Sequence, residues 1–141
     1  MATCTFFGHS DTSDTIAPML QQEIVALIEQ HGVTRFYVGN HGNFDRIVVH
    51  MLQRLQAIYP HIRYTVVLAY SPTVPGTYPT ENTLYPEEMA CVPKRFAIDR
   101  RNRWMLKNSK FVITHVQAPT GGAAKFKAVA EKQQKTVINL V

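Results

Sequence analysis

Three short apolar segments of this chain each lead into a polar turn that contains glycine. The turns are Gly8-His9-Ser10-Asp11, Gly39-Asn40-His41-Gly42-Asn43 and, after residues 111–115, Pro119-Thr120-Gly121-Gly122. Glycine lets the main chain approach a ligand closely, and a helix that starts at such a turn offers free N–H groups to an anion. The three turns therefore predict a site for a small molecule that carries phosphate.

The second turn gives the best local signal. Its two glycines lie three positions apart, and Asp45 follows in the first turn of the next expected helix, where a carboxylate suits the helix dipole. Asp45 then has two interpretations. It caps an ordinary helix, or it accepts hydrogen bonds from a ribose and exchanges a proton with a ligand. The chain has neither a Walker phosphate loop nor the Gly-x-Gly-x-x-Gly pattern of dinucleotide sites.

Basic side chains concentrate between residues 94 and 110, which hold seven of the fifteen Lys and Arg residues. Such a run is typical of a solvated helix face, and it would also suit the phosphates of a single-stranded nucleic acid. Arg101 differs in its context, because it lies early in the helix that leads to the third glycine turn. From there its guanidinium can reach a phosphate with two N–H groups. If Arg101 lies at the mouth of a cleft, its removal should scarcely affect folding.

Histidine and cysteine could bind a metal, but their spacing does not favour it. His9, His41 and His115 each fall at the end of an expected strand, yet no two of them share ligand spacing on one element. We interpret them as partners of a phosphate or of the main chain, and we expect no metal and no cofactor. Cys4 and Cys91 form no zinc pattern and are expected to be reduced thiols of a cytoplasmic protein.

Length and composition indicate one domain that spans residues 1–141. Hydrophobic residues make up 45% of the chain and charged residues 18%, which is ordinary for a soluble globular protein. The net charge of +5 favours anionic partners. Residues 1–10 do not resemble a secretory signal, and no apolar run approaches the ~20 residues of a membrane span, so we expect no membrane partner. Association with further copies of the chain is left open.

Apolar patterns predict strands that alternate with helices. We expect strands at 3–7, 35–39, 64–69, 111–115 and 136–140. We expect helices from a Thr15 cap to Gly32, from an Asn43 cap to Pro60, from an Asp99 cap to about 108, and at 123–133. Residues 71–93 hold five of the eight prolines and predict a surface excursion that covers the site.

This alternation predicts an α/β fold with an open, mostly parallel sheet of about five strands and helices on both faces. The carboxyl ends of parallel strands lie at one edge of such a sheet. We therefore expect the three glycine turns to line one cleft there.

On these residues the chain resembles the SLOG superfamily, the Rossmann-like group named after the Smf/DprA and LOG proteins. It is most similar to the YpsA-like branch of bacteria and phages. The resemblance rests on Gly8-His9 after the opening strand, Gly39-x-x-Gly42-x-Phe44-Asp45, Arg101-Asn102-x-Trp104-Met105 and the late Gly121-Gly122. It implies a Rossmann-like fold that binds a nucleotide or a nucleotide derivative at these loops.

The LOG enzymes of this superfamily cleave the N-glycosidic bond of a nucleoside monophosphate with an Arg and a Glu. Arg101 is similar in position to that Arg. The Glu belongs to a Pro-Gly-Gly-x-Gly-Thr-x-x-Glu stretch, whereas here the chain reads Pro119-Thr120-Gly121-Gly122-Ala123-Ala124-Lys125-Phe126 without a Glu. An acid that would protonate the leaving group is therefore missing from its expected place.

We therefore expect a binder, in the role of a ligand sensor. The alternative is a nucleoside-monophosphate N-glycosidase, or phosphoribohydrolase-like hydrolase, that uses Arg101 and Asp45 as catalytic residues. A second alternative is single-stranded nucleic-acid binding through residues 94–110. The candidate ligand residues come from the three turns, together with the carboxylate and the guanidinium. They are Gly8, His9, Ser10, Gly39, Asn40, Gly42, Asn43, Asp45, Arg101, Thr120, Gly121 and Gly122.

Overall fold

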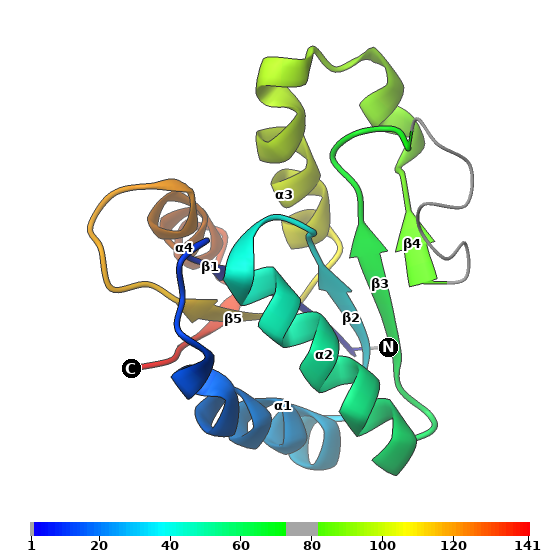
Figure 1. The fold of residues 1–141 in the computed structure, drawn as a ribbon, viewed down its shortest axis with the longest axis vertical. Coiled ribbons are helices and arrows are strands. Elements are labelled where there is room, and N and C mark those ends of the chain that lie inside the picture. The colour runs from blue at the N-terminus through cyan, green and yellow to red at the C-terminus, as the bar shows by residue number, and fades with distance from the viewer. Residues whose placement is uncertain (1, 73–81) are drawn as a thin grey trace.

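A computed structural model describes residues 2–72 and 82–141 of the chain, and a parallel sheet forms its centre (Figure 1). The strands are β1 (Ala2–Gly8), β2 (Val33–Val38), β3 (Arg63–Val67), β4 (Thr83–Leu84), β5 (Phe111–His115) and β6 (Thr136–Asn139). Their order is β4-β3-β2-β1-β5-β6, and every neighbouring pair is parallel. The open parallel α/β fold expected from the sequence is confirmed, and β4 adds a sixth strand to the expected five.

Helices cover both faces of the sheet. They are α1 (Ala17–His31), α2 (Gly42–Ile58), α3 (Ala97–Lys107) and α4 (Gly122–Lys132), together with the short 3-10 helices η1 (Asp14–Ile16), η3 (Glu87–Cys91) and η4 (Lys94–Phe96). The helices α1 and α2 pack against each other and on one face, while α3 and α4 pack on the other face. Among the described residues no helix is long and apolar enough to span a membrane.

Each face of the sheet has its own hydrophobic core. Phe6 and Phe36 face α1 and α2 and belong to the larger core. Phe7 and Val112 point the other way and pack with Phe126 of α4. Successive side chains of a strand point to opposite faces, so a strand that is covered on both sides is apolar at every position. This explains the consecutive apolar residues Phe6-Phe7 in β1 and Phe111-Val112-Ile113 in β5.

The expected helix caps at Thr15, Asn43 and Asp99 are all wrong. Ser13, and not Thr15, supplies the capping side chain, because its Oγ accepts the Thr15 N–H at the start of η1. The helix α2 begins at Gly42 with His41 as its N-cap, so Asn43 lies inside the first turn. Gly32 ends α1 in the left-handed conformation, with φ of 67°, as expected.

The α3 helix also begins before its expected cap. Its N-cap is Phe96, and Asp99 lies in its first turn. The proline-rich excursion at 71–93 supplies β4 and η3 at its described end. Residues 73–81 lie outside the described part of the chain, and with them the expectation that this excursion covers the site.

The strand order creates a crevice at the centre of the sheet. After β1 the chain crosses to β2 on one side through α1, and after β5 it crosses to β6 on the other side through α4. The loops that follow β1 and β5 therefore diverge toward opposite faces. In an open α/β sheet, ligands bind at such a switch point, outside the carboxyl ends of the strands.

Candidate functional site

A cleft of about 420 Å³ lies at the carboxyl ends of β1 and β5. The loop after β1, the start of α2, the inner face of α3 and the start of α4 form its walls. The candidate ligand residues that line it are Gly8, His9, Ser10, Asp45, Arg101, Gly121 and Gly122. The structure therefore brings residues from all three glycine turns to one edge of the sheet.

Other candidate residues lie beside this cleft. Gly39, Asn40 and Gly42 line an adjoining hollow of about 290 Å³, and Asp45 lines both spaces. Thr120 is exposed in the loop before α4 and lines neither of them. The second glycine turn thus reaches the main cleft through His41 and Asp45.

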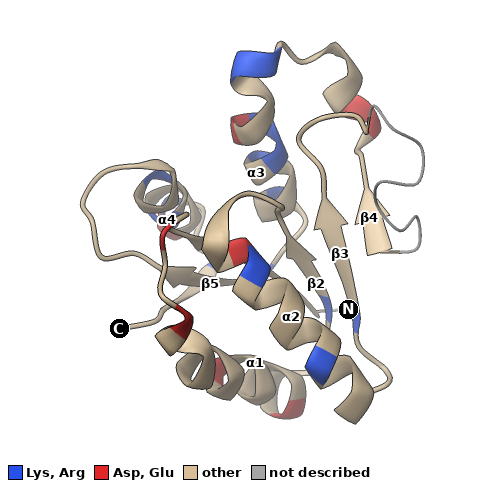
Figure 2. Cartoon of the chain, in the orientation of Figure 1, with Lys and Arg blue, Asp and Glu red and all other residues tan. Residues whose placement is uncertain are grey.

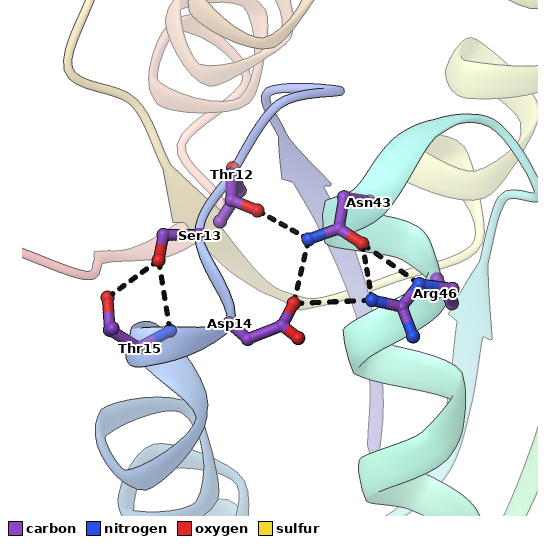
Figure 3. A network of polar contacts seen from close by, with 6 residues as sticks. All are labelled: Thr12, Ser13, Asp14, Thr15, Asn43 and Arg46. Atoms are coloured by element: carbon purple, nitrogen blue, oxygen red, sulfur yellow. Dashed lines mark hydrogen bonds and ion pairs between the residues drawn. The ribbon is translucent and has the colours of Figure 1, made fainter.

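Asn43 joins the first two turns to each other (Figure 3). Its side-chain amide donates to the Thr12 carbonyl and to Asp14 Oδ1, and its own Oδ1 accepts from Arg46 Nε at 2.9 Å. Arg46 also forms an ion pair with Asp14 at 3.3 Å. Asn43 therefore acts as a structural connector whose side-chain polar groups are already bonded within the protein.

Gly42 is required where these two turns touch. Its φ is +88°, and a Cβ atom at this position would lie 2.5 Å from the Ser10 Cα. The Ser10 carbonyl accepts the Asn43 N–H at 2.7 Å, which fixes the two main chains against each other. Both the backbone conformation and the space therefore exclude a larger residue.

We expect Gly42→Ala to lower the free energy of unfolding by about 2 kcal/mol, because alanine is strained at positive φ and its methyl group would meet main chain. Urea denaturation measures this change. Gly122→Ala is a matched control, because Gly122 has no positive φ and a Cβ there would have no atom within 4 Å. Equal stability of the Gly42→Ala variant and the unmodified protein would contradict the tight contact.

His9 links the first turn to the third. Its Nε2 accepts the main-chain N–H of Gln117 at 3.0 Å and lies 3.4 Å from the N–H of Ala118. Nearby, the His115 Nδ1 lies 3.2 Å from the Thr12 Oγ1, and burial together with the neighbouring His9 lowers the pKa of His115. These contacts hold the loop that leads into α4 against the loop after β1.

Arg101 is buried beneath the cleft, with 2% of its surface exposed. Its Nη1 donates to the Val67 carbonyl at 3.1 Å and to Asn40 Oδ1 at 3.3 Å, while its Nε donates to Asn102 Oδ1 at 2.8 Å. Its Nη2 lies 3.3 Å from His41 Nδ1. The sequence analysis considered a position at the cleft mouth, where removal of Arg101 would scarcely affect folding. Instead, the guanidinium forms part of the wall and ties α3 to β3 and to the second turn.

Asp45 lies close to this guanidinium. A Cβ atom on Gly39 would be 2.8 Å from Asp45 Oδ2 and 2.9 Å from Arg101 Nη1. Both charged groups therefore pack against the main chain at Gly39 in the second turn. Asp45 Oδ2 accepts the His41 N–H at 3.0 Å. Burial raises the pKa of Asp45 to about 6, against the opposing effects of this hydrogen bond and of the Arg101 charge. A carboxyl group with this pKa can hold or release a proton near neutral pH.

The start of α4 forms an open wall of the cleft. Gly121 is its N-cap with φ of 102°, and no side chain caps the helix. The first hydrogen bond of the helix runs from Lys125 N to the Gly121 carbonyl, so the N–H groups of residues 122–124 have no partner within the helix. A Cβ atom on Gly121 or Gly122 would meet nothing within 4 Å.

Some wall residues were not among the sequence candidates. Ile98, Asn102 and Met105 line the cleft from α3. They recur at helical spacing around Arg101 and therefore share its face of α3. The sequence could have identified them once Arg101 was taken as a site residue on a helix. Asn102 Oδ1 accepts from Arg101, and among the described residues its Nδ2 has no partner. Its N–H₂ group is therefore available to a ligand.

No group of three or more His, Cys, Asp or Glu side chains among the described residues is arranged to hold a metal ion. A comparison with protein-family models finds no match to this chain, and a comparison with curated proteins finds no significant match. Function is therefore inferred from the cleft itself.

Proposed function

We propose that the cleft binds a nucleotide or a nucleotide-derived small molecule and that the protein acts as a sensor of this ligand. The observation that carries the proposal is Gly122. Its backbone conformation does not require glycine, and no atom of the described residues excludes a side chain, yet the residue lines the cleft at the start of a helix. Room for a ligand against the main chain is what glycine provides at such a position.

The phosphate is best accommodated at the start of α4. The free N–H groups of residues 122–124 and the positive end of the helix dipole favour an anion there. Arg101 adds a positive charge to the same cleft. The second turn is less suited to a phosphate, because the N–H groups of His41 and Asn43 are already bonded to Asp45 and Ser10.

The remaining walls suit the other parts of a nucleotide. Asp45 and Asn102 supply a carboxylate and an amide that can bond ribose hydroxyl groups, while the exposed Ile98 supplies apolar surface for a base. The volume of about 420 Å³ lies within the range of roughly 300–1,000 Å³ that is usual for small-molecule pockets. On the motif resemblance we further propose membership of the YpsA-like branch of the SLOG superfamily.

A thermal-shift screen over mono-, di- and dinucleotides tests the proposal. A nucleotide at ~100 times its Kd adds about 2.7 kcal/mol to the free energy of unfolding. For a domain of this size the Tm should rise on the order of 5 °C. The absence of a shift across the panel at millimolar nucleotide would overturn the proposal.

Gly122→Ala separates binding from folding in the same assay. The unliganded variant should melt at or slightly above the Tm of the unmodified protein, because alanine favours a helix more than glycine does. Its nucleotide-induced shift should be lost, because the added methyl group lies where the phosphate binds. A full shift in this variant would exclude the start of α4 as the phosphate site.

One observation favours hydrolysis of a nucleotide as a second candidate function. Asp45 has a pKa of about 6 and lies next to Arg101 in the cleft, and shifted carboxyl groups of this kind occur at catalytic sites. An N-glycosidase would use Asp45 as the acid and Arg101 to bind the phosphate. Release of free base from the nucleotide panel, abolished in Asp45→Asn, would replace the sensor with this enzyme.

A further inference from the structure

The two halves of the chain carry opposite net charge. Residues 94–141 contain eleven Lys and Arg but only two Asp and Glu, a net charge of +9, whereas residues 1–93 contain four and eight, a net charge of −4. The helices α3 and α4 come from the basic half and share one face of the sheet. Figure 2 shows Lys and Arg along these two helices, whereas the charged residues of α1 are acidic. The excess of positive charge therefore lies with α3 and α4, whereas on the other face α1 is acidic and α2 carries Arg46 and Arg54 beside Asp45.

Many of these cations already have partners. Arg103 and Lys125 both bond Asp99, Arg100 lies 3.8 Å from Glu88, and Arg101 is buried in the wall of the cleft. Such exposed pairs hold the side chains only weakly, but they offset part of the charge.

Three lysines without an ion pair in the described part of the chain gather elsewhere. Lys107, Lys110 and Lys135 surround an open hollow of about 460 Å³ that we call the amino-edge hollow. It lies where β1, β5 and β6 begin, and so at the sheet edge opposite to the nucleotide cleft. Among residues 2–72 and 82–141, no Asp or Glu lines it.

The donors of this hollow are flexible side chains. The main-chain N–H groups of Lys110, Lys135 and Thr136 are bonded to Thr3, Ala130 and Lys110 carbonyls within the protein. What remains are lysine ammonium groups, which are hydrated point charges on long stems, and the amides of Gln133 and Gln134. A single small anion is held best by several fixed donors. Flexible ammonium groups instead suit a chain of phosphates whose orientation does not need to be fixed.

The basic surface also continues from the hollow along α3. Arg100, Arg103 and Lys107 recur at helical spacing on its exposed side. We propose that the amino-edge hollow binds the sugar-phosphate backbone of a nucleic acid without reading its bases, at a site separate from the nucleotide cleft. The contacts are electrostatic, so binding weakens steeply as salt displaces the protein from the phosphates.

Fluorescence anisotropy of a labelled oligonucleotide of ~20 nucleotides, single-stranded and as a duplex, tests this proposal with the full chain over a series of salt concentrations. The test variant combines Lys107→Gln, Lys110→Gln and Lys135→Gln. Its matched control, Arg54→Gln with Lys94→Gln and Arg95→Gln, removes the same charge from exposed positions outside the hollow. We expect the test variant to lose about tenfold or more in affinity and the control to lose much less. For the single strand, the slope of log K against log salt should fall by about 2 in the test variant.

Several results would overturn the proposal. One is the absence of oligonucleotide binding at about 50 mM salt. Another is an equal loss of affinity in the two triple variants. A third is displacement of the oligonucleotide by inorganic tripolyphosphate at an equal concentration of phosphate groups. Binding to anionic lipid vesicles without binding to either oligonucleotide would also overturn it. The nucleotide thermal shift should be unchanged in the test variant, so the failure of this proposal is distinguishable from the failure of the sensor.

Discussion

Asp45→Asn should raise the free energy of unfolding above pH 6 and leave it nearly unchanged below about pH 4. The pKa of Asp45 rises from the ordinary 3.8 to about 6 in the folded protein. Below pH 3.8 the Asp45 carboxyl group is protonated in both the folded and the unfolded protein, so it does not lower the free energy of unfolding. Between 3.8 and 6 the unfolded chain releases the proton more readily, so folding becomes less favourable as pH rises. Above about pH 6 the carboxyl group is ionised in both states, and burial of its charge lowers the free energy of unfolding by the full amount.

Each unit of pKa shift corresponds to about 1.4 kcal/mol, and water still reaches part of this half-buried side chain, so the expected gain at neutral pH is about 2 kcal/mol. The Asn amide oxygen keeps an acceptor for the His41 N–H. Urea denaturation of both proteins across the pH range measures the difference. Asp11→Asn, at an exposed position of the same cleft, removes one charge as a control and should not give this gain. A constant difference at all pH values would contradict the shifted pKa.

A carboxylate that destabilises the fold is typical of a functional position, where stability is lost for the sake of activity. If Asp45 bonds a ribose, nucleotide affinity falls in Asp45→Asn although the fold becomes more stable. The interpretation of Asp45 as a simple helix cap predicts the reverse, a small loss of stability with normal binding.

The fold could be predicted because its signals are local. The apolar run at 111–115 matches β5. The apolar stripe expected from Ile47 to Ile58 matches the buried face of α2 except at Ile58, which is exposed. Glycine at position 32 also ends α1 as expected. The two-residue β4 could not be predicted, because its pairing with β3 depends on a tertiary contact and its sequence has no strand period.

The site was only partly predictable. Strand alternation placed the three turns at one edge, because all parallel strands end there. The role of Asn43 was missed because its partners, Thr12 and Asp14, belong to a different loop. A local pattern favours Asn as a helix cap, but the long-range hydrogen bonds decide its place.

The burial of Arg101 was the least predictable feature. The sequence marked Arg101 as a candidate ligand residue, but nothing in the basic run shows that its side chain is buried whereas those of Arg100 and Arg103 are exposed. Its environment comes from Asn40 and His41 of the second turn and from Val67 of β3. Only the packing of α3 on the sheet brings these acceptors together.

Arg101→Met should lower the free energy of unfolding by about 3 kcal/mol, because it removes a buried cation together with its buried hydrogen bond to the Val67 carbonyl. Methionine keeps much of the side-chain volume, so the loss reports the polar contacts and not a cavity. Arg103→Met, at an exposed position two residues further along α3, is the matched control and should change stability little. Unfolding of Arg101→Met at the same urea concentration as the unmodified protein would contradict the role of Arg101 in the cleft wall.

The effects of Arg101→Met and Asp45→Asn on the free energy of unfolding should not be additive. The Arg101 charge holds the pKa of Asp45 down, so its removal should raise this pKa above about 6, which a carbon-13 NMR titration of the carboxyl group can measure. At neutral pH, Arg101→Met alone therefore leaves a carboxylate that has lost its nearby cation. With Asp45→Asn in the same chain that charge is absent, and the double variant should be more stable than the sum of the single changes by about 1–2 kcal/mol. Strict additivity, together with an unchanged Asp45 pKa, would mean that the two groups act independently.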